Sequence, residues 1–317
     1  MIKGLIVLPI VLGSMFLIGG GAIVGVAVAH NHTNSKLVTN EYEITDSFTN
    51  IKFDVQTANV EFVVSTDGET RVVCEEREKY PHEVEVSNDT LNIKFVDNVK
   101  WYEKVFNWSW RTEKITVYLP VAAYGNLDME ASTGALKVKG DYTFDNLNVV
   151  ASTGALSLES DIVNNIDVKM STGAVKFNGV NAKEANIKTS TGDILISNTN
   201  IENQLTVKAS TGDVTLRKVR AKDLDAKFST GDMKLDDVLI ENHVEHKAST
   251  GRFTFANFDC DTLNCKTDTG DIKGAIISEH IIYAHSDTGR VNVPHCATGS
   301  IWNIETDTGR INITIAA

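Results

Sequence analysis

A Thr-Gly pair recurs at almost constant spacing through the carboxyl-terminal two-thirds of the chain. Successive glycines of these pairs are 19 or 20 residues apart, and there are ten: Gly134, Gly154, Gly173, Gly192, Gly212, Gly231, Gly251, Gly270, Gly289 and Gly309. One such unit is too short to bury its apolar face alone, so units of this kind fold only by stacking on their neighbours. The repeat therefore predicts a solenoid.

Each unit shows the alternation of a β-strand on both sides of its glycine. The residue two positions after the glycine is apolar in all ten units, as in Leu136 and Val214, and apolar residues also stand five and seven positions before most of the glycines. A period of two is typical of strands. The residue before each threonine is Ser or Asp, whose side-chain oxygen can bond to a nearby backbone N–H, and glycine tolerates a positive φ in the turn that follows.

We therefore expect an all-β chain with four parts. Residues 126–317 form a β-solenoid of about ten coils, a rod of roughly 48 Å at about 4.8 Å per coil. Residues 40–125 lack the repeat but contain short alternating segments separated by turn signals such as Asp67-Gly68, which predicts an antiparallel β cap. Residues 30–39 are a polar spacer, and residues 1–29 are a membrane segment.

The amino-terminal segment carries no ionisable side chain from Gly4 to Ala29. As a helix it would be roughly 39 Å long, enough to cross the ~30 Å hydrocarbon core of a bilayer. We expect a single transmembrane helix that holds the bulk of the chain on the extracytoplasmic side of the cell membrane. The alternative is a secretory signal cleaved near Ala29, because Ala27-Val28-Ala29 fits the small-x-small pattern.

Four motifs together resemble those of the bacterial β-strand-repeat proteins called putative adhesins. They are Phe48-Thr49-Asn50-Ile51, Leu91-Asn92-Ile93, Ile115-Thr116-Val117-Tyr118-Leu119-Pro120, and the repeated Ser-Thr-Gly-Asp followed by Ile or Val. The resemblance covers residues 45–317. It implies the fold rather than an activity, and because some related proteins belong to envelope-stress systems, it also allows a regulatory role.

One column of lysines is a candidate binding site. A lysine stands four positions before the glycine in six consecutive units: Lys169, Lys188, Lys208, Lys227, Lys247 and Lys266. A positive charge on every coil would match an anionic cell-wall polymer, such as a teichoic acid or an acidic polysaccharide. The alternative is a solvated strand face whose charge is partly cancelled by Asp167, Asp225 and Glu245.

A second candidate is the aromatic segment that contains Trp101, Trp108 and Trp110. These side chains either shield the open edge of the first coil or, if exposed, contact sugar rings or a membrane interface.

No metal or cofactor is expected. Asp193, Asp213, Asp232 and Asp271 follow the glycines, but pairing with Arg252, Arg290 and Arg310 explains them better than calcium does. The four cysteines have no metal-ligand spacing; Cys260 and Cys265 could pair in an oxidising compartment. His246 occupies an inward position and is interpreted as a core residue.

The net charge of −12 argues against nucleic acid as a partner. Because no gap between glycines exceeds 20 residues, no inserted loop is available to build a catalytic groove. We expect a noncatalytic, membrane-tethered surface scaffold or binding module. The first alternative is an envelope-stress sensor or regulator that binds a partner protein, and the second is a polysaccharide-active enzyme. Arg310 to Ala317 end the chain without a cap, so end-to-end association through the last coil is also expected.

Overall fold

The computed structural model describes residues 11–12, 25–30, 37–96 and 113–316, and all regular elements in these ranges are strands. The amino-terminal strands are β1 (Val11–Leu12), β2 (Gly25–His30), β3 (Leu37–Ile44), β4 (Asn50–Val64), β5 (Thr70–Arg77), β6 (His82–Ser87), β7 (Thr90–Phe95) and β8 (Glu113–Leu119). The remaining strands are β9 (Ala123–Asn178), β10 (Asn181–Ala182), β11 (Glu184–Thr191), β12 (Ile194–Thr211), β13 (Val214–Thr230), β14 (Met233–Thr250), β15 (Phe253–Thr269), β16 (Ile272–Ile276), β17 (Ile281–Thr288), β18 (Val291–Asn292), β19 (Ile301–Thr308) and β20 (Ile311–Ile315).

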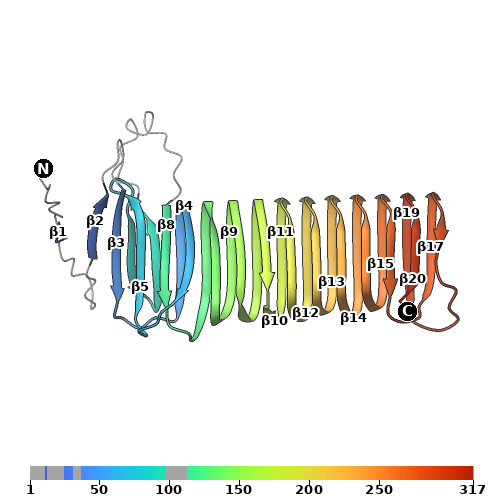
Figure 1. The fold of residues 1–317 in the computed structure, drawn as a ribbon, viewed down its shortest axis with the longest axis horizontal. Helices are drawn as coiled ribbons and strands as arrows, with labels where there is room; N and C mark the ends of the chain where they lie inside the picture. The colour runs from blue at the N-terminus through green and yellow to red at the C-terminus, as the bar shows by residue number, and fades with distance from the viewer. Residues whose placement is uncertain (1–10, 13–24, 31–36, 97–112, 317) are drawn as a thin grey trace, which may run out of the picture.

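The repeats stack into a rod of parallel coils (Figure 1), which confirms the predicted β-solenoid. Equivalent positions pair in register: Thr211 on β12 lies opposite Thr230 on β13, and Thr230 opposite Thr250 on β14. Parallel pairing without a shift keeps each column of side chains on one line along the rod.

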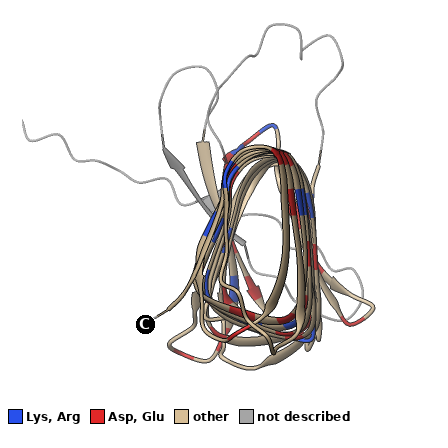
Figure 2. Cartoon of the chain, turned by 90° about the vertical axis from the view of Figure 1, so that its right-hand side faces the viewer, with Lys and Arg blue, Asp and Glu red and all other residues tan. Residues whose placement is uncertain are grey.

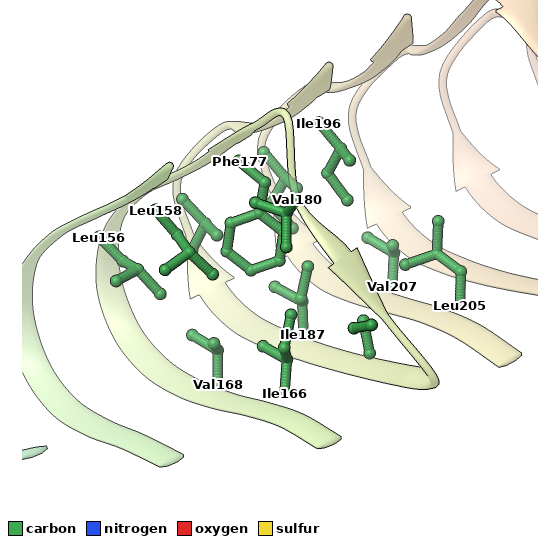
Figure 3. Packing of buried hydrophobic residues seen from close by; sticks show 14 of the residues in the cluster. Leu156, Leu158, Ile166, Val168, Phe177, Val180, Ile187, Ile196, Leu205 and Val207 are labelled. Carbon is green, nitrogen blue, oxygen red and sulfur yellow. The ribbon is translucent and has the colours of Figure 1, made fainter. Parts of the chain in front are cut away.

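The apolar columns fill the interior of the coils. Figure 3 shows Leu158, Phe177 and Ile196 from successive coils pointing into the same space, and each of them is fully buried. Because one coil buries this face only against its neighbours, the core is continuous along the whole rod.

Close approach of neighbouring backbones explains the glycine column. A Cβ added to Gly212 would lie 2.2 Å from the carbonyl oxygen of Gly192, and one added to Gly154 would lie 1.7 Å from that of Gly134. Gly212 has a φ of +137°, a backbone conformation that glycine adopts easily, so the expected need for a positive φ also favours glycine there. The contact with the preceding coil, however, would exclude any side chain at both positions.

The coils do not all stack in chain order. From Gly134 to Gly270 each coil lies on the preceding one, which makes about seven regular turns rather than the ten predicted. The backbone N–H of Gly270 then donates to Thr308 O (2.9 Å), and that of Gly309 donates to Thr288 O (3.1 Å). The coil of Gly309 is therefore inserted between those of Gly270 and Gly289, and β17 lies at the far end of the rod (Figure 1).

Burial of Trp302 accounts for this inversion. Trp302 is completely buried between Leu263 on β15 and Ile282 on β17, and its indole Nε1–H donates to Cys260 O (3.2 Å). In chain order its coil would be the open end of the rod and would leave this large ring partly in water. The inverted order instead places the smaller Ile282 and Ala284 at the end, where both are half-buried.

The amino-terminal region combines a first coil with a cap. β4 pairs in parallel with β9, with Thr57 opposite Thr133, and Ala58 takes the place of a column glycine. β7 and β8 also run parallel to β4, whereas the pairs β3–β5, β5–β8 and β6–β7 are antiparallel. The cap is thus mixed rather than purely antiparallel. The sequence did not reveal this first parallel coil because its corner, Gln56-Thr57-Ala58-Asn59, lacks the glycine that marks the other coils.

The predicted transmembrane helix is not supported. Of residues 4–29, the structure describes Val11–Leu12 and Gly25–Ala29, and both pieces are strand; β2 pairs antiparallel with β3. Within the described residues no helix is long and apolar enough to span a bilayer.

Candidate functional site

The six lysines of the candidate site form one row, called the lysine ladder below. Their strands bring each residue directly opposite the next in the order Lys169, Lys188, Lys208, Lys227, Lys247 and Lys266. The side chains of Lys208 and Lys247 are 42% and 53% exposed. Seen along the rod axis, basic residues of successive coils overlap on the outline of the coils (Figure 2).

Acidic neighbours offset part of the ladder's charge. Asp225 Oδ1 lies 3.1 Å from Lys227 Nζ, and Asp225 Oδ2 lies 3.8 Å from Lys208 Nζ. Glu245 pairs with Lys247, and this hydrogen bond raises the pKa of the Lys247 ammonium. Lys188 has no ion pair in the described structure. Exposed pairs of this kind contribute little energy, so the ammonium groups remain able to exchange partners.

The ladder forms one side of an open groove that runs along the rod. One cavity of about 610 Å³ extends from the first coil to Lys188, and a second of about 300 Å³ continues from Lys188 to Lys227. Three columns line the groove: the lysines, an inward column with Met170, Thr189, Ala209 and Phe228, and the serines Ser171, Ser190, Ser210 and Ser229. Ammonium and hydroxyl donors thus line a shallow surface with a mostly apolar column between them.

Carboxylates lie at both ends of the ladder. Asp54 on β4 lies opposite Glu130, and both line the first cavity. At the other end Lys266 pairs with Glu305 at 3.5 Å across the β15–β19 contact. The basic part of the groove therefore has a defined length.

The acidic column after the glycines has a structural role. Asp213 Oδ1 accepts the backbone N–H of Asp232 (2.9 Å), and Asp232 Oδ1 accepts that of Arg252 (2.8 Å). The Arg252 guanidinium also donates to Asp232 and holds the pKa of that carboxyl below its usual range. These carboxylates bind the next coil, and Arg252 with Asp232 and Arg310 with Asp271 form two Asp-to-Arg pairs.

A buried polar cluster in the cap escaped the sequence analysis. His82 Nδ1 lies 2.6 Å from Glu76 Oε2, and the same oxygen accepts the backbone N–H of His82 (2.7 Å). One ligand atom each of Cys74, Glu76 and His82 lies within 4.8 Å of the others. The three residues come from β5 and β6, and no spacing in the sequence marks them as a set. Polar residues at inward strand positions were the only available signal.

The cysteines, the histidine and the tryptophans singled out in the sequence do not join the groove. Cys260 and Cys265 are buried free thiols and form no disulfide. His246 is buried and stacks on Phe253 with ring centroids 4.4 Å apart. Trp101, Trp108 and Trp110 lie outside the described residues.

Comparison with known proteins gives one family and several solved structures. The Toastrack DUF4097 family model matches residues 48–205 and 202–315. The chain is similar to a putative adhesin from Bacteroides fragilis NCTC 9343 (14% identity, TM-score 0.44, covering 89% of this chain and 98% of that chain). It is also similar to a putative adhesin from Parabacteroides distasonis ATCC 8503 (11%, 0.43, 88% and 98%) and to a lipid-binding protein, likewise described as putative, from the same strain (15%, 0.36, 86% and 96%). No curated protein matches the chain.

Proposed function

We propose that the rod of this chain, which belongs to the Toastrack DUF4097 family, is a noncatalytic binding module. Its groove would hold an extended anionic polymer of the cell envelope. The observation that carries this proposal is the register of the lysine ladder. Six like charges stand directly opposite one another on parallel strands, an arrangement that costs about 0.2–1 kcal/mol for each opposed pair. An anionic ligand lying along the ladder would offset that cost.

The groove fits an extended polymer better than a compact ligand. The ammonium groups recur at about the 4.8 Å distance between strands, so a chain with regularly spaced charges can contact several coils at once. The serine column supplies hydroxyl donors beside the ammonium groups. Multiple weak contacts of this kind add up because the rigid rod has already fixed their positions.

The lining of the groove favours binding over catalysis. Between Lys188 and Lys227 the side chains are lysine, serine, threonine, alanine and phenylalanine, with no carboxylate or imidazole among them. Hydrolysis of a glycosidic bond usually needs a pair of carboxylates, and the described lining of the groove offers such a pair only at its amino-terminal end, where Asp54 lies opposite Glu130. A polysaccharide-active enzyme is therefore the least supported of the three functions considered.

We further propose that residues 4–29 tether this module to the cell membrane with the rod on the extracytoplasmic side. The support is the length of the uncharged segment. An envelope-stress regulator remains the alternative function, and an acidic partner protein would then occupy the same ladder.

Binding of defined polymers to the full chain tests the function. The probes are poly(glycerol phosphate), polygalacturonate and neutral dextran. The triple variant Lys188→Gln, Lys208→Gln, Lys227→Gln should bind at least one of the two polyanions at least tenfold more weakly than the unaltered chain. The matched control is Lys176→Gln, Lys222→Gln, Lys234→Gln, which removes the same charge from exposed positions outside the ladder.

Equal weakening in both triple variants would overturn the proposal, because it would show attraction to overall charge alone. Binding of dextran as tight as that of the polyanions would overturn it too. Absence of polyanion binding, together with ladder-dependent capture of a single acidic membrane protein from the envelope, would favour the regulatory alternative.

A further inference from the structure

The cap contains a cluster of buried side chains that the groove does not use. Cys74 and Glu76 occupy alternate, inward positions of β5, His82 begins β6, and all three are completely or almost completely buried. A thiol, a carboxylate and an imidazole in one buried cluster are costly unless each polar group has a partner. These three groups are also the side chains that bind zinc in proteins.

The three ligand atoms lie close enough together for one ion after small adjustments. Single ligand atoms of Cys74, Glu76 and His82 lie within 4.8 Å of one another. In a tetrahedral zinc site, neighbouring ligand atoms are roughly 3.3–3.8 Å apart, given bonds of about 2.0–2.3 Å. Cys74 Sγ would move inward to reach this spacing, whereas Glu76 Oε2 and His82 Nδ1, now 2.6 Å apart, would separate slightly.

The environment of His82 supplies a second, independent observation. Within the described residues, Nε2 of His82 and Oε2 of Glu113 are both buried without a hydrogen-bond partner, and they face each other at 4.0 Å. When the Nδ1 proton is shared with Glu76, Nε2 of the neutral ring carries no proton to donate. A metal at Nδ1 would move the ring proton to Nε2, and a shift of about 1 Å would complete a hydrogen bond to Glu113.

We propose that the cap binds one zinc ion through Cys74 Sγ, Glu76 Oε2 and His82 Nδ1, with Glu113 accepting the Nε2–H bond of the imidazole. On binding, the Cys74 S–H bond breaks, the sulfur–zinc bond forms and the thiol proton leaves to solvent. The mixture of thiolate, imidazole and carboxylate ligands favours zinc over magnesium or calcium. The three protein ligands leave the fourth tetrahedral position to a trapped water, and the role of the ion is to join β5 and β6 of the cap.

Cobalt and zinc binding by the full chain test the site. The chain is purified under reducing conditions and refolded with one equivalent of zinc or cobalt, because the buried site is open to an ion only before the cap closes. We expect about one zinc per chain by elemental analysis, a near-ultraviolet thiolate-to-cobalt absorption band, and a higher melting temperature with zinc than in chelator.

Matched variants identify the ligands. Cys74→Ser should abolish the cobalt band, whereas Cys296→Ser, which changes a cysteine far along the rod, should leave it intact. Glu113→Gln should keep the band but weaken metal affinity about 10–100-fold, as expected for a group that only orients a ligand. Folding of each variant without metal is checked by its circular dichroism spectrum.

Three results would overturn the proposal. They are less than one tenth of an equivalent of zinc in the refolded unaltered chain, a cobalt spectrum without a thiolate band, and a band that persists in folded Cys74→Ser.

Discussion

The backbone N–H of Gly270 donates a 2.9 Å hydrogen bond to the carbonyl oxygen of Thr308. This contact joins the coil of Gly270 to the last coil of the chain and places the intervening coil outside both. The strand at the end of the rod is therefore β17, whose one lateral partner in the described structure is β19. The inverted order decides which residues meet solvent, or another molecule, at that end.

End-to-end association, expected at the carboxyl terminus from the sequence, is accordingly proposed at β17. Tyr283 on β17 and Val291 on the following β18 are exposed, and one edge of β17 is free to pair within the described structure. Charged side chains on an edge strand oppose such pairing. The double change Tyr283→Lys, Val291→Lys should shift the chain from a concentration-dependent dimer to a monomer in sedimentation equilibrium. An unaltered chain that is monomeric at all concentrations would rule out the association.

Alanine in the glycine column should destabilise the rod severely. The Cβ of Gly212→Ala would meet the Gly192 carbonyl oxygen at 2.2 Å, so neighbouring coils must separate. We expect a loss of about 3 kcal/mol in urea unfolding, the upper part of the range for overpacked sites. The matched change is Gly179→Ala, where φ is +71° but no atom lies within 4 Å of the added Cβ. That variant should lose about 1 kcal/mol, the cost of the backbone conformation alone. Similar losses in the two variants would contradict the close-contact explanation.

The carboxylate of Asp271 should make the far end of the rod sensitive to acid. Hydrogen bonds from Lys273 Nζ (2.6 Å) and from the backbone N–H of Arg310 (2.8 Å) hold the pKa of Asp271 far below its usual range. A carboxyl whose pKa is lowered on folding adds stability above its unfolded pKa of about 3.9. That contribution disappears as the pH falls through the lower folded pKa.

The variant Asp271→Asn should therefore be less stable than the unaltered chain at pH 6, and the difference should shrink between about pH 4 and pH 2. Unfolding by urea at a series of pH values measures this. Asp145→Asn, which changes an exposed carboxylate without an ion pair in the described structure, is the control. A constant difference for Asp271→Asn across the range would refute the explanation.

His246 should lower the stability of the rod in mild acid. Burial lowers its pKa to about 4, from an unfolded value of 6.5, although Glu245 acts in the opposite direction. The unfolded chain therefore takes up a proton as the pH falls below 6.5, while the folded chain does not until about pH 4. Stability should decrease across that window by at most about 1.4 kcal/mol per pH unit.

Replacing His246 with leucine should remove this decrease. We expect His246→Leu to gain stability relative to the unaltered chain between pH 6.5 and pH 4.5, and to show a constant difference above pH 7. His243→Leu, on the exposed opposite face of β14, is the control. Parallel stability curves for His246→Leu and the unaltered chain would show that the imidazole is not buried in its neutral form.

Most of the fold was predictable because it is a local pattern repeated many times. The positions of Leu216 and Leu235 relative to their glycines already assigned them to one inward column, and parallel stacking followed from the short length of each unit. The reason for the glycines was only partly predictable. Turn geometry predicted a positive φ at the glycines. It did not predict that the carbonyl oxygen of the preceding coil excludes a Cβ, because that contact joins residues distant in sequence.

Some of the candidate sites could likewise be predicted from the sequence, and others could not. The lysine ladder could be found because its spacing equals that of the repeat. The first coil could not, since Ala58 replaces the marker glycine, and neither could the meeting of Cys74 with His82, because their strands follow no repeat and associate only in the folded cap.

The sequence by itself determined the repeat, its strands and the columns that face inward or outward, because all of these depend on neighbours within one unit or at a fixed interval. Only the tertiary structure decided the order of the last two coils, the groove beside the lysines and the buried cluster of the cap. These depend on which surfaces lose the most contact with water when the whole chain packs together, as the burial of Trp302 beneath β17 shows.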